Sequence, residues 1–200
     1  MLKAPEELQT FKGKFRDKKV IFLVRDPRDV IVSSYFEMNK RGNLFGDNPY
    51  ENRKAAFEGS LVEFINRREG GFDTIIQYYN IWAQNRAVPE GFLLVRYEDL
   101  KHNPVRDLRR VVDFLGFTEV DDAVLSEAVE FASFDNMRKM ESAGTFQSEV
   151  LNPADRSDQE SYKTRKGKVG GYQDYLPREE SARLTNKMQV ELSDYYGYGS

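Results

Sequence analysis

The chain has 200 residues, 40% of them hydrophobic, and a formal net charge of −3, which suits one domain with one core over residues 1–200 and argues against a general nucleic-acid binder. It has no cysteine and a single histidine, so the composition excludes a disulfide framework, thiolate chemistry and a histidine-rich metal site, and we expect no bound metal. No apolar stretch approaches the length of a membrane span, so we expect a cytoplasmic protein.

The first predicted elements are a short strand and a helix joined by polar residues. Val20 to Val24 is an apolar run typical of a parallel strand that is buried on both faces, and Arg25 stands at its carboxyl end. Asp26 is a good N-cap and is followed by proline, so a helix should begin there. Ligands of open α/β sheets bind beyond the carboxyl ends of the strands, where Arg25 and the hydroxyl of Ser33 could hold a phosphate. The alternative is that Arg25 pairs with Asp26 or Asp29 in a surface network.

Further elements follow in chain order. Residues 41–50 are rich in glycine and asparagine and predict a loop, either a lid over a ligand or, by default, an ordinary surface loop. Phe92 to Arg96 is a second strand of the buried type. Helical patterns are expected over residues 51–68, 72–86, 104–115, 121–131 and 177–196, with a polar loop over 140–162.

The segment Tyr162–Gly171 reads YKTRKGKVGG and holds four basic residues between positions 163 and 168. A glycine lets backbone N–H groups approach an anion closely, and Arg165 and Lys166 beside Gly167 would supply positive charge. The segment is therefore a second candidate anion site, although a short basic run is more often a solvated turn.

Two more segments, FLLVRYEDL at Phe92–Leu100 and FASFDNM at Phe131–Met137, complete a pattern of four. In this order the segments resemble the sulfotransferase family, whose members move a sulfuryl group from 3′-phosphoadenylyl sulfate (PAPS) to an acceptor hydroxyl or amine. The resemblance covers nearly all of the chain. It implies an α/β fold, namely a P-loop-NTPase-like three-layer α/β/α domain with a parallel sheet, of which this chain would form the C-terminal part.

The resemblance also implies a nucleotide site formed by Arg25, Ser33, Tyr97, Phe134, Met137, Arg165, Lys166 and Gly167. Arg25 and Ser33 would hold the 3′-phosphate, which the loop around Gly167 would also grip. The tyrosine would lie against the nucleotide. Phe134 and Met137 would sandwich the adenine, although each taken alone reads as a plain core residue, and Ala132 stands where a threonine is common in the family.

Two features of the family are missing from the sequence: the P-loop-like turn that wraps the 5′-phosphosulfate and the histidine that takes the acceptor proton. We therefore assign no catalytic residue and expect a fold truncated at its N-terminus. Two strands of the buried type do not form a stable sheet alone, so we also expect self-association through the sheet edge and no sulfuryl transfer by these residues alone.

Three functions stay open at this point. The first is a PAPS-dependent sulfotransferase that acts by in-line displacement at sulfur on a small-molecule, carbohydrate or lipid acceptor. The second is an inactive remnant or pseudoenzyme that binds PAPS or adenosine 3′,5′-bisphosphate (PAP) without turnover. The third, a nucleoside or small-molecule kinase, shares the sheet architecture but needs a Walker-type lysine and a carboxylate for Mg²⁺ that the sequence does not show.

Overall fold

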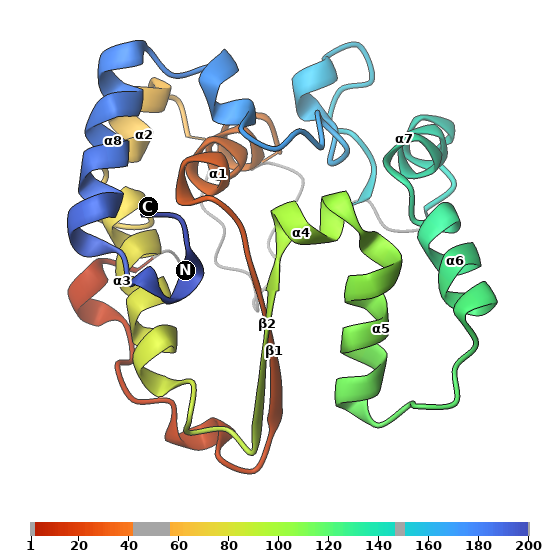
Figure 1. Ribbon diagram of the computed structural model, residues 1–200. Helices are drawn as coiled ribbons and strands as arrows, with labels where there is room; N and C mark the ends of the chain where they lie inside the picture. The colour runs from red at the N-terminus through yellow and green to blue at the C-terminus, as the bar shows by residue number, and fades with distance from the viewer. Residues whose placement is uncertain (1–2, 42–56, 147–150, 200) are drawn as a thin grey trace.

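A parallel sheet with helices on both faces forms the centre of the protein (Figure 1). The computed structural model describes residues 3–41, 57–146 and 151–199. Within these ranges the sheet has two strands, β1 (Lys19–Val24) and β2 (Gly91–Arg96). The helices are Pro27–Arg41 (α1), Leu61–Ile65 (α2), Phe72–Asn85 (α3), Tyr97–His102 (α4), Pro104–Leu115 (α5), Asp122–Phe131 (α6), Phe134–Ala143 (α7) and Arg178–Glu191 (α8).

The layers are visible in Figure 1, which views the sheet along its edge. Helices α1, α2, α3 and α8 lie on one side of the sheet, and α5, α6 and α7 lie on the other. This arrangement confirms the predicted α/β fold with a parallel sheet. Both strands end at the same edge, because the register pairs Val24 with Arg96.

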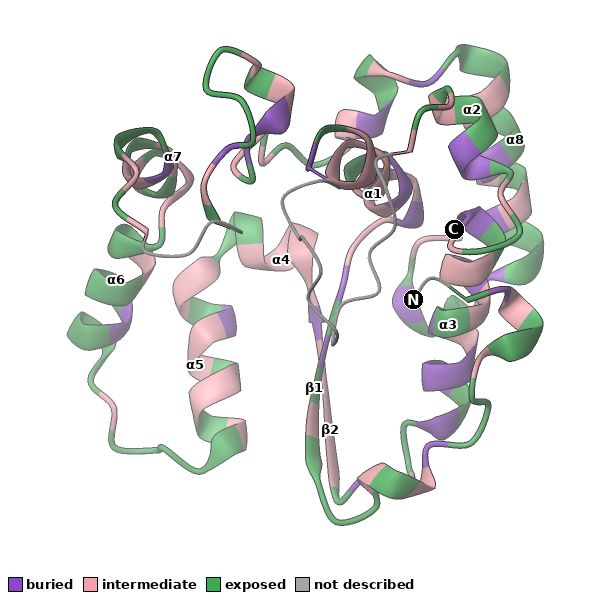
Figure 2. Cartoon of the chain, turned by 180° about the vertical axis from the view of Figure 1, so that it is seen from behind, coloured by how far each residue is buried: buried purple, intermediate pink, exposed green. Residues whose placement is uncertain are grey.

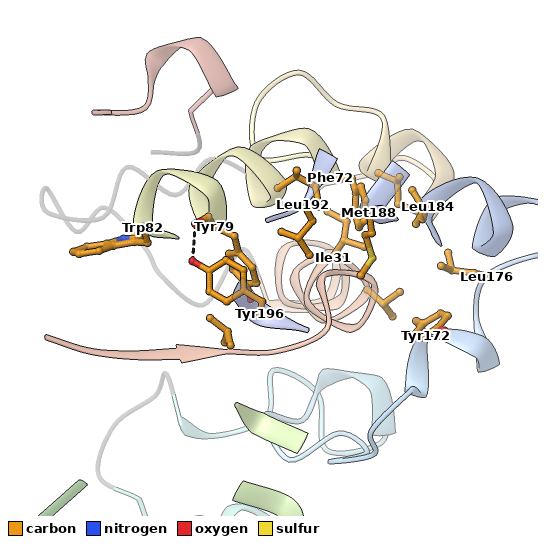
Figure 3. Close-up of a cluster of buried hydrophobic side chains, with 14 of the residues drawn as sticks. Ile31, Phe72, Tyr79, Trp82, Tyr172, Leu176, Leu184, Met188, Leu192 and Tyr196 are labelled. Carbon is orange, nitrogen blue, oxygen red and sulfur yellow. Dashed lines mark hydrogen bonds between the residues drawn. The ribbon is translucent and has the colours of Figure 1, made fainter. Parts of the chain in front are cut away.

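The main core lies between the sheet and the helices α1, α3 and α8 (Figure 3). Phe22 and Val24 of β1 face this core, and the Phe22 ring lies 5.5 Å from Trp82 and 5.8 Å from Tyr79. Each large apolar side chain buried here stabilises the fold by about 1.5–3 kcal/mol. The buried members on the helices and the C-terminal segment include Ile31, Phe72, Ile76, Leu184, Met188, Leu192 and Tyr196.

The opposite face of β1 is open in the described residues, and the prediction of a strand buried on both faces is wrong there. Ile21 is 37% exposed and Leu23 is 56% exposed. Helix α5 packs beside β2, where Val95 is buried, and leaves the neighbouring face of β1 uncovered. Figure 2 shows the same imbalance, because buried residues gather on α1, α3 and α8 and are sparse on α5 to α7.

Several helices begin and end where their caps predict. The Asn103 side chain accepts a hydrogen bond from the backbone N–H of Arg106 and starts α5, and Gly116, with φ +95°, ends it. Asp26 likewise accepts from the Arg28 N–H at the start of α1. The predicted helices over 72–86 and 121–131 correspond to α3 and α6.

The local structure differs from the sequence predictions in three places. Residues 140–143, expected in the polar loop, belong to helix α7, which begins at Phe134 because the Ser133 side chain accepts from the Asn136 N–H and caps it. Residues 97–102, which include His102 and for which no element was predicted, form α4. The helix expected to reach residue 196 ends at Glu191, because the backbone of Leu192 is extended, with φ −82° and ψ 135°, and Ser193 caps a new turn.

The segment before α3 is described in part. The predicted loop over 42–50 and the first residues of the predicted helix, 51–56, lie outside the described residues. The described remainder begins its helix α2 at Leu61, because Ser60 and Glu63 form a reciprocal capping box. None of the helices in the described ranges combines the length and apolarity needed to cross a lipid bilayer.

The end of β1 is fixed to α3 by a buried tyrosine. The Tyr79 hydroxyl accepts a hydrogen bond from the Arg25 N–H at 3.1 Å and donates to the Arg25 carbonyl at 3.0 Å. The Tyr196 hydroxyl in turn donates to the Tyr79 carbonyl at 2.6 Å. This chain of hydrogen bonds holds the backbone of Arg25 at the carboxyl edge of the sheet.

Replacing this tyrosine tests the anchor. We expect Tyr79→Phe to lower the free energy of unfolding by about 1–3 kcal/mol, because the two polar groups of the Arg25 backbone lose their partner. Tyr78→Phe is the matched control, since Tyr78 is 40% exposed and its hydroxyl has no hydrogen bond among the described residues; it should change the value by less than about 0.5 kcal/mol. Urea unfolding measures both, and equal effects would contradict the anchor.

The titration of Tyr79 should lower the free energy of unfolding at alkaline pH. Burial raises the pKa of Tyr79 to about 12. The folded pKa lies above the unfolded one, so the stabilisation is complete below about pH 10 and is lost as the pH rises towards 12, up to about 2–3 kcal/mol in all. The stability difference between the wild type and Tyr79→Phe, which lacks this titration, should therefore shrink over that range. A difference that stays constant with pH would show that the phenol does not titrate this way.

Candidate functional site

A pocket of about 260 Å³ lies beyond the carboxyl ends of the two strands. Its walls come from the end of β1, the first two turns of α1, the start of α4, helix α7 and the segment 163–175. We call residues 163–172 the basic loop. Eight lining residues are the eight that the sequence singles out: Arg25, Ser33, Tyr97, Phe134, Met137, Arg165, Lys166 and Gly167.

The sheet register explains how Arg25 and Tyr97 meet. Val24 and Arg96 are paired at the strand ends, so the next residue of each strand lies side by side at the edge. The guanidinium carbon of Arg25 stands 4.3 Å from the centre of the Tyr97 ring, which is a cation–π contact. Burial raises the pKa of Tyr97, so its hydroxyl stays protonated at neutral pH.

Arg25 is also paired with Asp29. Its Nε and Nη2 atoms lie 3.2 and 2.9 Å from Asp29 Oδ2, and Nη2 donates to the Lys168 carbonyl at 2.7 Å. The Asp29 carboxylate is fully buried, so the pair that the sequence suggested as a surface network is part of the pocket wall. The Nη1 group has no partner among the described residues, which leaves its two N–H donors for a ligand.

The basic loop lies against helix α7 at Gly167. This glycine has φ +56°, a left-handed conformation that side chains disfavour. A Cβ atom at Gly167 would stand 2.4 Å from the Phe134 ring. Glycine at this position therefore allows the loop backbone to approach the aromatic wall of the pocket.

The cations of the basic loop have carboxylate partners within the protein. Arg165 donates to Glu160 at 3.0 Å and to the Tyr175 hydroxyl, and it lies 4.1 Å from the centre of the Phe36 ring. Lys166 lies 3.2 Å from Asp174. Hydrogen bonds to the Tyr175 hydroxyl and to Asp174 raise the pKa of Lys166, so it stays charged at neutral pH. An anion that enters the pocket has to compete with these carboxylates.

The remaining predicted residue, Ser33, lies two turns into α1. It is exposed and lines the pocket, and its hydroxyl has no hydrogen-bond partner among the described residues. The hydroxyl is therefore available as a neutral donor in the pocket that Arg25 also lines.

The pocket also contains residues that the sequence did not single out. Tyr175 contacts Glu160, Arg165 and Lys166, and no local pattern marks it. Of the two partners that the sequence offered for Arg25, the structure pairs it with Asp29, and the i, i+4 spacing at the start of α1 is the signal that favours this carboxylate. Within the described ranges no cluster of three or more His, Cys, Asp or Glu residues could hold a metal ion.

Comparison with protein families gives one match over most of the chain. Residues 4–196 match the family model described as Sulfotransferase domain. Cytosolic sulfotransferase 16 of Arabidopsis thaliana is 25% identical over 183 residues, which are 88% of this chain and 51% of that protein. Cytosolic sulfotransferase 10 of the same species is 32% identical over 87% of this chain and 50% of its own length. The chain thus spans about half the length of these relatives.

A solved structure shows the same fold. Retinol dehydratase in complex with androsterone and the inactive cofactor PAP superimposes with a TM-score of 0.64 at 22% identity. The similarity covers 92% of this chain and 50% of the other. At this level of identity the likeness supports the fold alone.

Two glycines of the basic loop provide a test of its packing. We expect Gly167→Ala to lower the free energy of unfolding by about 1–3 kcal/mol, because the residue is left-handed and the new methyl group meets Phe134. Gly171→Ala is the matched control, since its Cβ would stand no closer than 3.8 Å to its neighbours. Thermal unfolding of both variants measures the effect. A control that loses as much stability would mean that the loss at Gly167 does not come from its contact with Phe134.

Proposed function

The chain belongs to the sulfotransferase family, and from that premise we propose that its pocket binds the PAP portion of PAPS within an enzyme that transfers the sulfuryl group to an acceptor hydroxyl or amine. The observation that carries the proposal is the convergence of eight residues from four separate segments on one pocket. Bound PAPS would supply the sulfuryl group. The residues of this chain that line the pocket would bind and position the nucleotide.

The chemistry of the pocket suits a nucleotide that carries a 3′-phosphate. The Nη1 group of Arg25, the Ser33 hydroxyl and the charges of Arg165 and Lys166 would hold the phosphate through charge-assisted hydrogen bonds. Because Asp29 occupies the Nε and Nη2 side of Arg25, this arginine would contact the phosphate from its other side.

The wall of the pocket formed by α7 suits a nucleobase. Phe134 and Met137 stand three residues apart on α7, one turn along the same face, and both line the pocket. An aromatic ring and a thioether offer the flat, polarisable surfaces on which adenine packs. Tyr97 would lie beside the nucleotide with its ring held by Arg25.

The acceptor that we propose is a small hydroxylated molecule. The related retinol dehydratase binds androsterone, a compound of that kind. Since several relatives carry the word cytosolic in their names, we also propose a cytoplasmic location. The predicted self-association through the sheet edge stays a prediction.

The pseudoenzyme would keep the same nucleotide contacts, so binding does not separate it from the enzyme. A sulfuryl-transfer assay with labelled PAPS separates them when the chain is extended by an N-terminal segment with the P-loop-like turn and the histidine, because the enzyme would then give product and the pseudoenzyme would not. The kinase alternative predicts that ATP with Mg²⁺ raises the melting temperature more than PAP does. Thermal shift with the two ligands decides between those classes.

Calorimetry tests the 3′-phosphate site. PAP should bind much more tightly than AMP, which lacks that phosphate. Arg25→Ala and Arg165→Ala should each weaken PAP binding by about 2–4 kcal/mol, and Ser33→Ala by about 1 kcal/mol, since a neutral donor contributes less than a charged one.

Arg109→Ala is the matched control for these variants. It also removes a positive charge, but Arg109 pairs with Asp113 and Asp122 and does not line the pocket. It should leave PAP affinity within about 0.5 kcal/mol of the wild type. Equal affinity of the wild type for PAP and AMP would refute the proposed site.

A further inference from the structure

We infer that two buried carboxylates, Asp29 and Glu141, are positioning residues that hold the basic loop at its two ends and thereby set how strongly the pocket prefers a ligand with a 3′-phosphate. The inference rests on the proposed function, since it concerns the same pocket. It goes further by naming the groups that give the pocket its shape.

Glu141 holds the start of the loop. The residue is 1% exposed and stands on α7. Its carboxylate accepts hydrogen bonds from the backbone N–H of Lys163 at 2.6 Å and from that of Thr164 at 2.9 Å, and a third from the Thr164 hydroxyl. Glu141 therefore ties the loop to the helix that carries Phe134 and Met137.

Asp29 holds the end of the loop. The residue is 2% exposed and stands on α1. It accepts from the backbone N–H of Gly170 at 2.9 Å and from that of Tyr172 at 2.8 Å. The same carboxylate receives the Arg25 guanidinium, so Asp29 joins the loop to the arginine at the strand end.

The loop residues between these two carboxylates are the ones that would contact the phosphate. Arg165, Lys166 and Gly167 lie after the Glu141 contacts and before the Asp29 contacts. The chain that follows α7 crosses the carboxyl side of the strands on its way to α8 (Figure 1). Because the loop is fixed at both ends and is short, the charged groups of Arg165 and Lys166 have few positions open to them.

Because both residues are negatively charged, the direction in which PAP affinity changes when they are neutralised tests the inference. A carboxylate beside a phosphate site repels the phosphate, so electrostatics alone predicts tighter PAP binding when Asp29 is neutralised. A positioning role predicts weaker PAP binding. The amide of Asp29→Asn has one acceptor oxygen, whereas the Arg25 guanidinium and the N–H groups of Gly170 and Tyr172 all need an acceptor. A purely structural role predicts lower stability with no change in ligand preference.

The experiment measures the ratio of PAP affinity to AMP affinity by calorimetry. We expect Asp29→Asn and Glu141→Gln each to reduce this ratio by about tenfold while AMP affinity stays within about twofold of the wild type. Glu141 does not line the pocket, so an effect of Glu141→Gln has to act through the loop. If Asp29→Asn does not fold, Glu141→Gln still tests the inference.

Asp107→Asn is the matched control. Asp107 is a fully buried carboxylate paired with Arg106 and Arg110 on α5, away from the pocket. It should lower the melting temperature and leave the affinity ratio unchanged. A ratio that rises or stays the same in the Asp29 and Glu141 variants would overturn the inference. A wild type without preference for PAP would instead refute the proposed function.

Discussion

The parallel pairing of β1 with β2 is the constraint on which the site depends. Because the register ends with Val24 opposite Arg96, the chain leaves both strands at one edge and delivers Arg25 next to Tyr97. Tyr79 then fixes the Arg25 backbone from the core side of the sheet. The position of the arginine therefore follows from backbone hydrogen bonds, and its side chain has little freedom left before any ligand arrives.

Internal carboxylates balance the positive charge of the pocket. Arg25 faces Asp29, Arg165 faces Glu160, and Lys166 and Lys168 share Asp174. These pairs differ in burial. Asp29 is fully buried and also accepts two backbone N–H groups, whereas Asp174 is more than a third exposed and is screened by solvent. A phosphate would therefore displace Asp174 at little cost and leave Asp29 in place.

The sequence predicts the parts of the site that are local, and misses those that join distant segments. Arg25 and Ser33 share one strand–helix unit, and Arg165 to Gly167 form one short run, so composition and spacing reveal them. The contacts of Asp29 with the loop span 141 and 143 residues, and a single sequence carries no signal for them. The open face of β1 was also missed, since an apolar run does not tell which neighbours cover it.

The helical state of residues 134–143 changes what that segment can do. In a loop, Phe134 and Met137 would be two independent contacts. On α7, Phe134, Met137 and Glu141 follow the i, i+3, i+7 spacing of one helix face, so the residues proposed to contact the base and the carboxylate that holds the loop turn towards the same side. On α1, Asp29 and Ser33 share a face in the same way, at i, i+4. Each helix thus carries, on one face, a residue proposed to contact the nucleotide and a carboxylate that holds the basic loop. A shift of either helix therefore moves the nucleotide contact and the loop together.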